Sequence, residues 1–105
     1  MFNVQIMKEY IPNIRIISVD HERTTTAAVR LRHALDAHGL KHYRVMNVFC
    51  HLEAGRWGVH SGTVAIDVDG QIIWRGPELT ENLAEQFCAG LPVYIKQKKD
   101  ELGIA

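Results

Sequence analysis

The stretch between Gly58 and Gly76 constrains the fold more than any other part of the chain. It contains two apolar runs, residues 64–68 and 71–75, on either side of the dipeptide Asp69-Gly70. An Asp-Gly dipeptide in this position is typical of a two-residue type I′ turn, because both of its central residues need a positive φ. The sequence therefore predicts a β-hairpin over this stretch.

Counting outward from the turn predicts the register of this hairpin. The expected pairs are Val68–Gln71, Ile66–Ile73 and Val64–Arg75 on one face, with Ala65 and Asp67 opposite Trp74 and Ile72 on the other. Both faces are largely apolar, so the hairpin is expected to be covered on both sides.

The residues before the hairpin predict a β-α-β unit. Residues 14–19 form a β-branched run that indicates a buried strand, and the threonines of the polar segment 21–26 are candidate helix caps. A helix is expected to about His38, where Gly39 suits its end. Residues 42–49 then predict a second strand, parallel to the first through a right-handed crossover. Residues 50–57 can form two helical turns.

A final helix is expected after the hairpin. Thr80 can cap it, and Gly90 with Pro92 would end it. Its buried stripe is expected at positions four apart, namely Leu79, Leu83, Phe87 and Leu91. The tail from Val93 onward is expected to be a partly frayed surface helix. Residues 1–13 fit either a short strand or a helical turn.

Composition limits the class of protein. The 105 residues fit one domain spanning 1–105, with twelve basic and twelve acidic residues and a formal net charge of zero. That balance argues against nucleic acid or an anionic membrane as partner, since either favours a basic surplus. The chain shows no signal-peptide pattern and no apolar run long enough to span a bilayer. We therefore expect a cytoplasmic protein whose two cysteines, which form no CxxC, are reduced.

The order strand, helix, parallel strand, short helix, hairpin, helix resembles a thioredoxin fold over about residues 14–91. Residues 35–40 resemble the end of the first helix in glutaredoxin-like proteins, and residues 53–61 resemble the approach to their cis-proline loop. Residues 64–76 resemble their strand–turn–strand. The resemblance implies an α/β thioredoxin-like domain: a four-stranded mixed sheet with helices on both faces, and 92–105 as a C-terminal tail or helix.

Two departures from that family bear on function. The family's CxxC would fall at His21 and Thr24 or at Thr25 and Ala28, and neither register contains a cysteine. A threonine hydroxyl cannot replace a thiolate in disulfide exchange. The family's cis-proline would fall at Thr63, and a cis bond before a non-proline residue is costly, so a trans loop is expected. Conventional dithiol–disulfide activity is therefore not expected.

The candidate binding residues come from two segments expected to face one another. They are His21, Thr24 and Thr25 at the start of the first helix, and Ser61, Gly62 and Thr63 in the loop before the hairpin. A helix start at the carboxyl end of a strand favours anions, so a peptide carboxylate is one possible ligand. Ordinary helix capping explains the threonines equally well.

Cysteines, tryptophans and histidines leave further alternatives open. Cys50 is either a buried structural thiol or a reactive one beside His51, whereas Cys88 is expected to pack on the last helix. Trp74 is expected in the core, and Trp57 is a candidate for a partner surface. His38 and His42 are spaced i, i+4, but Gly39 interrupts the helix between them. Cys50, His51 and His60 could meet in space, but a metal site needs three or four converging ligands and scattered surface histidines are expected instead, so neither metal nor cofactor is expected.

Three functional hypotheses remain, with the oligomeric state open. The first is a redox-inactive thioredoxin-like module that binds another protein or a peptide. The alternative is a divergent single-cysteine thiol oxidoreductase that uses Cys50. A histidine-based metal-binding or pH-responsive protein is the third.

Overall fold

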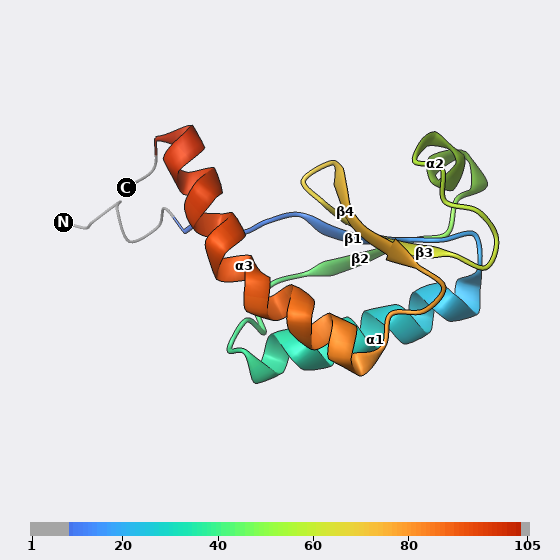
Figure 1. The fold of residues 1–105 in the computed structure, drawn as a ribbon, viewed down its shortest axis with the longest axis horizontal. Helices are drawn as coiled ribbons and strands as arrows, with labels where there is room; N and C mark the ends of the chain where they lie inside the picture. Colours follow the sequence, from blue (N-terminus) through green and yellow to red (C-terminus); the bar gives the residue numbers. More distant parts are fainter. Residues whose placement is uncertain (1–8, 104–105) are drawn as a thin grey trace.

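The computed structural model describes residues 9–103, and in them a mixed four-stranded sheet lies between helices on both faces (Figure 1). The elements in chain order are β1 (Ile14–Ile17), α1 (His21–Ala37), β2 (Val45–Val48), α2 (His51–Arg56), β3 (Val64–Val68), β4 (Gln71–Gly76) and α3 (Glu81–Leu102). The strand order is β2-β1-β3-β4, with β1 parallel to β2 and antiparallel to β3. The α/β class and the β-α-β unit predicted from sequence are confirmed.

The main core lies between the sheet and the helices α1 and α3, which share one face (Figure 1). Ile14, Ile16 and Ile66 from the central strands meet Leu31 of α1 and Leu91 of α3 there. A smaller cluster on the other face packs α2 against the sheet; its buried members are Ile17, Ala54, Val59 and Ala65. Because side chains alternate along a strand, β1 and β3 supply both clusters.

The hairpin turn is confirmed, but the predicted register is wrong beyond its first pairs. Asp69 and Gly70 have φ values of 55° and 85°, as a type I′ turn needs. Val68 pairs with Gln71 and Asp67 with Ile72, but a bulge follows at Ile73 and shifts every later pair by one. The observed partners beyond the bulge are Ile66–Trp74, Ala65–Arg75 and Val64–Gly76.

The predicted burial of the hairpin on both faces holds for β3 but not for β4. Every residue of β3 is buried, whereas β4 alternates between exposed and half-buried positions because it is an edge strand. Trp74 is half-buried against the main core, close to the expected position.

Helix α1 begins earlier than the threonine caps implied. Asp20 is its N-cap residue, so the threonines lie within the helix, where Thr24 Oγ1 donates to the Asp20 carbonyl and Thr25 Oγ1 to that of His21, both at 3.0 Å. The predicted end is confirmed, since α1 ends at Ala37 and Gly39 follows with φ 74°.

Helix α3 does not end at Gly90 and Pro92 as predicted. Thr80 caps it by accepting a hydrogen bond from the Leu83 amide at 3.1 Å, but the helix then continues through Pro92 to Leu102 and bends along its length (Figure 1). Tyr94 and Ile95 pack against the core beyond the proline, which stabilises the continued helix. The buried positions are Ala84, Cys88 and Leu91, while Leu83 and Phe87 are half-buried at the margin.

The first thirteen residues are described only in part. Residues 9–13 form neither a strand nor a helical turn, and the rest of that prediction lies outside the described residues. Within residues 9–103, no helix is both long and apolar enough to cross a membrane.

Candidate functional site

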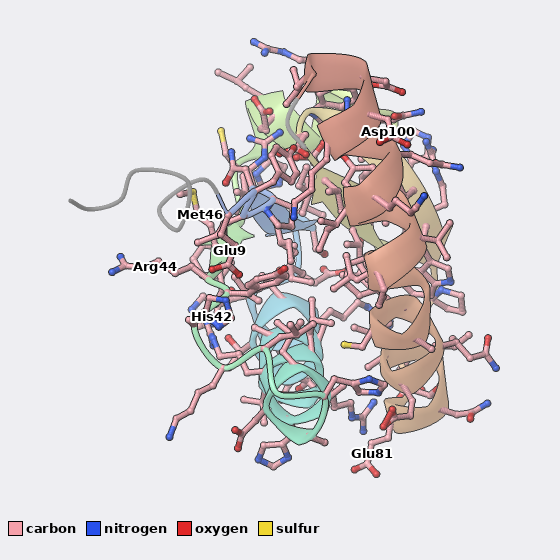
Figure 2. The ribbon with its side chains drawn as sticks, turned by 90° about the vertical axis from the view of Figure 1, so that its left-hand side faces the viewer. Glu9, His42, Arg44, Met46, Glu81 and Asp100 are labelled. Atoms are coloured by element: carbon pink, nitrogen blue, oxygen red, sulfur yellow. The ribbon has the colours of Figure 1, made fainter. Side chains whose placement is uncertain are left out.

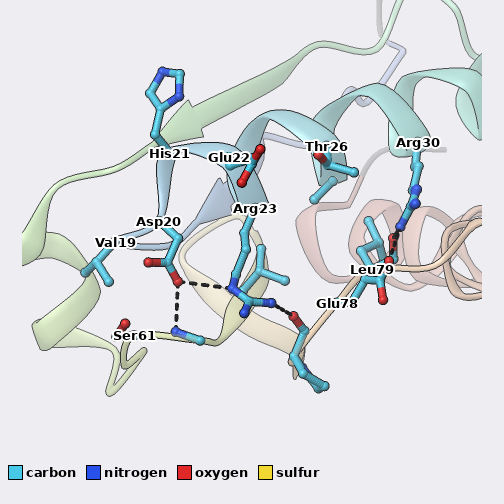
Figure 3. A pocket seen from close by; sticks show the side chains of 14 residues that line it. Val19, Asp20, His21, Glu22, Arg23, Thr26, Arg30, Ser61, Glu78 and Leu79 are labelled. Atoms are coloured by element: carbon cyan, nitrogen blue, oxygen red, sulfur yellow. Dashed lines mark hydrogen bonds and ion pairs between the residues drawn. The ribbon is translucent and has the colours of Figure 1, made fainter.

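The candidate site lies where β1 ends and α1 begins. Three chain segments meet there: residues 18–23, the loop 61–63 before β3, and the segment 77–79 between β4 and α3 (Figure 3). They surround a pocket of about 690 Å³ whose charged lining residues are Asp20, Glu22, Arg23, Arg30 and Glu78. We call this hollow the α1 pocket.

Asp20 holds the first two segments together. Its Oδ2 accepts hydrogen bonds from the Gly62 amide at 2.8 Å and from Arg23 Nε at 3.2 Å, and the second of these is also an ion pair (Figure 3). Ser18 is buried beside it, and its hydroxyl donates to the Thr63 carbonyl at 3.0 Å. The Gly62 amide and the Thr63 carbonyl are therefore bonded within the chain, so a ligand meets side chains here more than free backbone.

Two arginines on one face of α1 reach the third segment. Arg23 Nη1 donates to the Pro77 carbonyl, and Arg30 Nη1 donates to Glu78 Oε2 at 2.7 Å and to the Leu79 carbonyl at 3.1 Å. Positions 23 and 30 are seven apart, so the two side chains lie two turns apart on the same side of the helix. They close the side of the α1 pocket that faces α3.

The six residues proposed from sequence divide into two groups. His21, Ser61 and Gly62 line the α1 pocket, so the prediction that these two segments meet is confirmed for them. Thr24 is fully buried and Thr25 points its hydroxyl back along the helix, so neither lines the pocket. Thr63 is half-buried, follows a trans peptide bond, and contributes its carbonyl to Ser18 rather than a group to the pocket.

Sequence reasoning missed the charged residues that dominate the pocket. Asp20 directly follows the predicted strand, at the edge where functional groups of α/β sheets gather, and that position was an available signal. Arg23, Arg30 and Glu78 gave no signal, because their pairing joins segments about fifty residues apart in sequence.

Cys50 is exposed, so of the two alternatives left open for it the buried structural thiol is wrong. It follows β2 and occupies the N-cap position of α2. The neighbouring Phe49 ring stacks on His21 with centroids 4.5 Å apart, which brings the end of β2 close to the start of α1. Cys50 itself does not line the α1 pocket. Cys88 is buried as predicted, and burial raises the pKa of its thiol to about 11.

The remaining candidates make local contacts. Trp57 is half-buried, packs against the smaller cluster and donates its ring N–H to Glu53 Oε2 at 3.0 Å, and its place on a partner surface stays a prediction. His38 and His42 contact Glu85 at 2.5 Å and Glu9 at 2.8 Å. Within residues 9–103, no three side chains of the metal-ligating types converge as a site requires.

The lining of the α1 pocket suits recognition better than covalent chemistry. Ser61 and His21 share no hydrogen bond in the described part of the chain, so they do not form a nucleophile–base pair. The lining offers carboxylates, guanidinium groups and the hydroxyls of Thr26 and Ser61, which bind polar and charged segments. Comparison of the chain with protein-family models, with curated proteins and with solved structures finds no match.

Proposed function

We propose that this protein is a redox-inactive thioredoxin-like domain that binds another protein or a peptide through the α1 pocket. The thioredoxin-like assignment is supported by the order of the elements: a parallel β-α-β unit, then a short helix, an antiparallel hairpin and a last helix. The observation that carries the proposed function is the make-up of the pocket, which joins three segments through charged side chains while both cysteines lie elsewhere.

The proposed mechanism is recognition by a largely preformed surface. Asp20 and Arg23 are already fixed by the Gly62 amide and the Pro77 carbonyl, so little side-chain entropy is lost when a partner binds. Glu22 and Ser61 are exposed at the rim and are left to contact the partner. A partner segment that carries both charges and hydrogen-bonding groups matches this lining.

The proposal is tested with a displayed random-peptide library selected on the folded protein. Affinities of the selected peptides are then measured for the wild type, for Ser61→Arg in the rim, and for Gln86→Arg on an exposed position of α3. We expect Ser61→Arg to weaken binding at least about tenfold, because a bulky cation fills the pocket mouth. Gln86→Arg should leave it unchanged. The proposal would be overturned if the affinity of the selected peptides were unchanged by Ser61→Arg, or if the library yielded no binder.

The second candidate function is thiol chemistry at Cys50, favoured by the exposure of that thiol. The discriminating measurement is the rate of alkylation against pH for the wild type and for Cys50→Ala. An apparent pKa well below about 8.5 that disappears in Cys50→Ala would support a reactive thiol. We expect instead the rate of an ordinary accessible cysteine and no disulfide reductase activity.

A further inference from the structure

Two adjoining hollows lie at the far end of α1 from the α1 pocket. One, of about 490 Å³, lies beside the C-terminal part of α1 and the start of β2; the other, of about 350 Å³, lies beside the second half of α3. Tyr43 lines both hollows, so they adjoin at that side chain. Their floor is apolar and consists of Leu35, Leu40, Tyr43, Val45 and Ile95.

The rim of these hollows is strongly basic. Five of the twelve lysines and arginines of the chain line them, against the single acid Asp36, although the chain as a whole is neutral. They are Arg32, Lys41, Arg44, Lys96 and Lys99, and with the apolar floor we call them the basic surface.

The basic side chains of this surface form no salt bridge with a carboxylate among the described residues. Arg44 points away from the body, whereas the nearby Glu9 lies beside His42 and contacts it (Figure 2). The positive potential of this surface is therefore available to a partner.

We propose that the basic surface binds an acidic segment of a protein partner, one in which apolar side chains alternate with carboxylates. The carboxylates would meet the lysines and arginines of the rim, and the apolar side chains would cover the floor around Tyr43 and Ile95. The charge segregation argues for this occupant, because a partner of complementary charge is attracted to this end of the molecule.

Two other polyanions fit the surface less well. Single-stranded nucleic acids need exposed aromatic faces for stacking, and Tyr43 is only 7% exposed. A membrane surface needs large apolar side chains that protrude among the basic ones, whereas the five apolar side chains of the floor are buried or half-buried. A short acidic peptide can reach such a recessed floor.

The basic surface is separate from the α1 pocket. On α1, residues between 21 and 30 line the α1 pocket and residues between 32 and 36 line the basic surface, and the two share no lining residue. This proposal therefore does not depend on the proposed function, and either can fail without the other.

The test uses a fluorescein-labelled peptide of alternating glutamate and leucine and a matched peptide with glutamine for glutamate. Binding is measured by fluorescence anisotropy and located by amide NMR shifts in the full chain. The variant Lys41→Glu with Arg44→Glu reverses two exposed charges of the rim. The control Arg56→Glu with Arg75→Glu makes the same change in net charge on α2 and β4, away from this surface.

We expect the acidic peptide to shift the amides around Tyr43 and the start of β2. The rim variant should weaken its binding at least about tenfold, and the control less than about twofold. Raised salt should weaken binding as well, since the charges are exposed. Equal binding of the glutamine peptide, shifts on another face, or binding of anionic vesicles or oligothymidine in preference to the peptide would overturn the proposal.

Discussion

At the scale of single residues, the buried carboxylate of Asp67 depends on one arginine for its compensation. Asp67 is fully buried in β3 on the face that α2 covers, and Arg15 of β1 lies opposite it in the sheet. Arg15 Nε bonds Asp67 at 2.8 Å, and its Nη1 bonds Glu53 of α2 at 3.1 Å. The second oxygen of Asp67 has no hydrogen-bond partner among the described residues. Arg15 is thus the main compensation for a buried negative charge.

Replacing Arg15 by methionine should therefore destabilise the protein by about 3 kcal/mol. The value lies at the low end for a broken buried pair because Arg15 is itself 20% exposed. The double variant Arg15→Met with Asp67→Leu should recover most of the loss, since neither charge then remains buried. Urea unfolding of the three proteins measures this. A single variant as stable as the wild type would contradict the role given to Arg15.

At the scale of an element, helix α3 is a case in which the local sequence favours the end of a helix but tertiary packing favours its continuation. Gly90 and Pro92 are ordinary signals for the end of a helix, but packing of Tyr94 and Ile95 against the core favours ten further residues of helix. Gly90 lies exposed inside that helix, and a methyl group added there would meet no atom within 4 Å.

The change Gly90→Ala should stabilise the protein by about 0.5–1 kcal/mol, because alanine loses less backbone entropy in a helix than glycine. The matched control is Gly39→Ala, where there is equal space but φ is 74° and an alanine is strained. That variant should be destabilised. Thermal unfolding compares the two, and a loss of stability in Gly90→Ala would show that residues 90–92 do not continue the helix.

The same conflict explains which elements could be predicted. The Asp69-Gly70 turn, the stop at Gly39 and the cap at Thr80 depend on chemistry within a few residues, and all three are confirmed. The bulge at Ile73 was missed because both faces of this hairpin are apolar, so no alternation fixed the register. In the candidate site, the sequence predicted that residues 21–26 and the loop 61–63 face one another. The contacts of Arg23 with Pro77 and of Arg30 with Glu78 could not be predicted, because they join segments that only the finished fold brings together.

At the scale of the whole molecule, one side chain joins both ends of the described chain to the hairpin. The carboxylate of Asp69 accepts hydrogen bonds from Tyr10 of the N-terminal segment, from Tyr94 of α3 at 2.6 Å, and from the Asn13 amide at 2.8 Å. These donors hold the pKa of Asp69 below its ordinary value against the opposing effect of its burial. Burial and the neighbouring carboxylate together raise the pKa of Tyr10 to about 12 and also raise that of Tyr94.

These pKa shifts make the stability of the folded protein depend on pH at both the alkaline and the acidic end of the range. A tyrosine whose pKa is raised on folding contributes stability that is present below pH 10 and is lost as the pH rises toward 12, because the unfolded chain gives up its proton first. Asp69 behaves in the opposite sense, and its contribution is lost as the pH falls through and below 3.8.

The variant Asp69→Asn tests the role of the Asp69 charge while it keeps the hairpin turn. Asparagine tolerates the positive φ at this position, so the hairpin should survive while the acceptor charge is removed. NMR titration of ring-labelled tyrosine should find Tyr10 near 12 in the wild type and between 10 and 12 in the variant, since burial persists. The exposed control variant Asp36→Asn should leave the pKa of Tyr10 at its wild-type value near 12. If Tyr10 of the wild type titrated near 10, Asp69 would not join the N-terminal segment to α3 in solution.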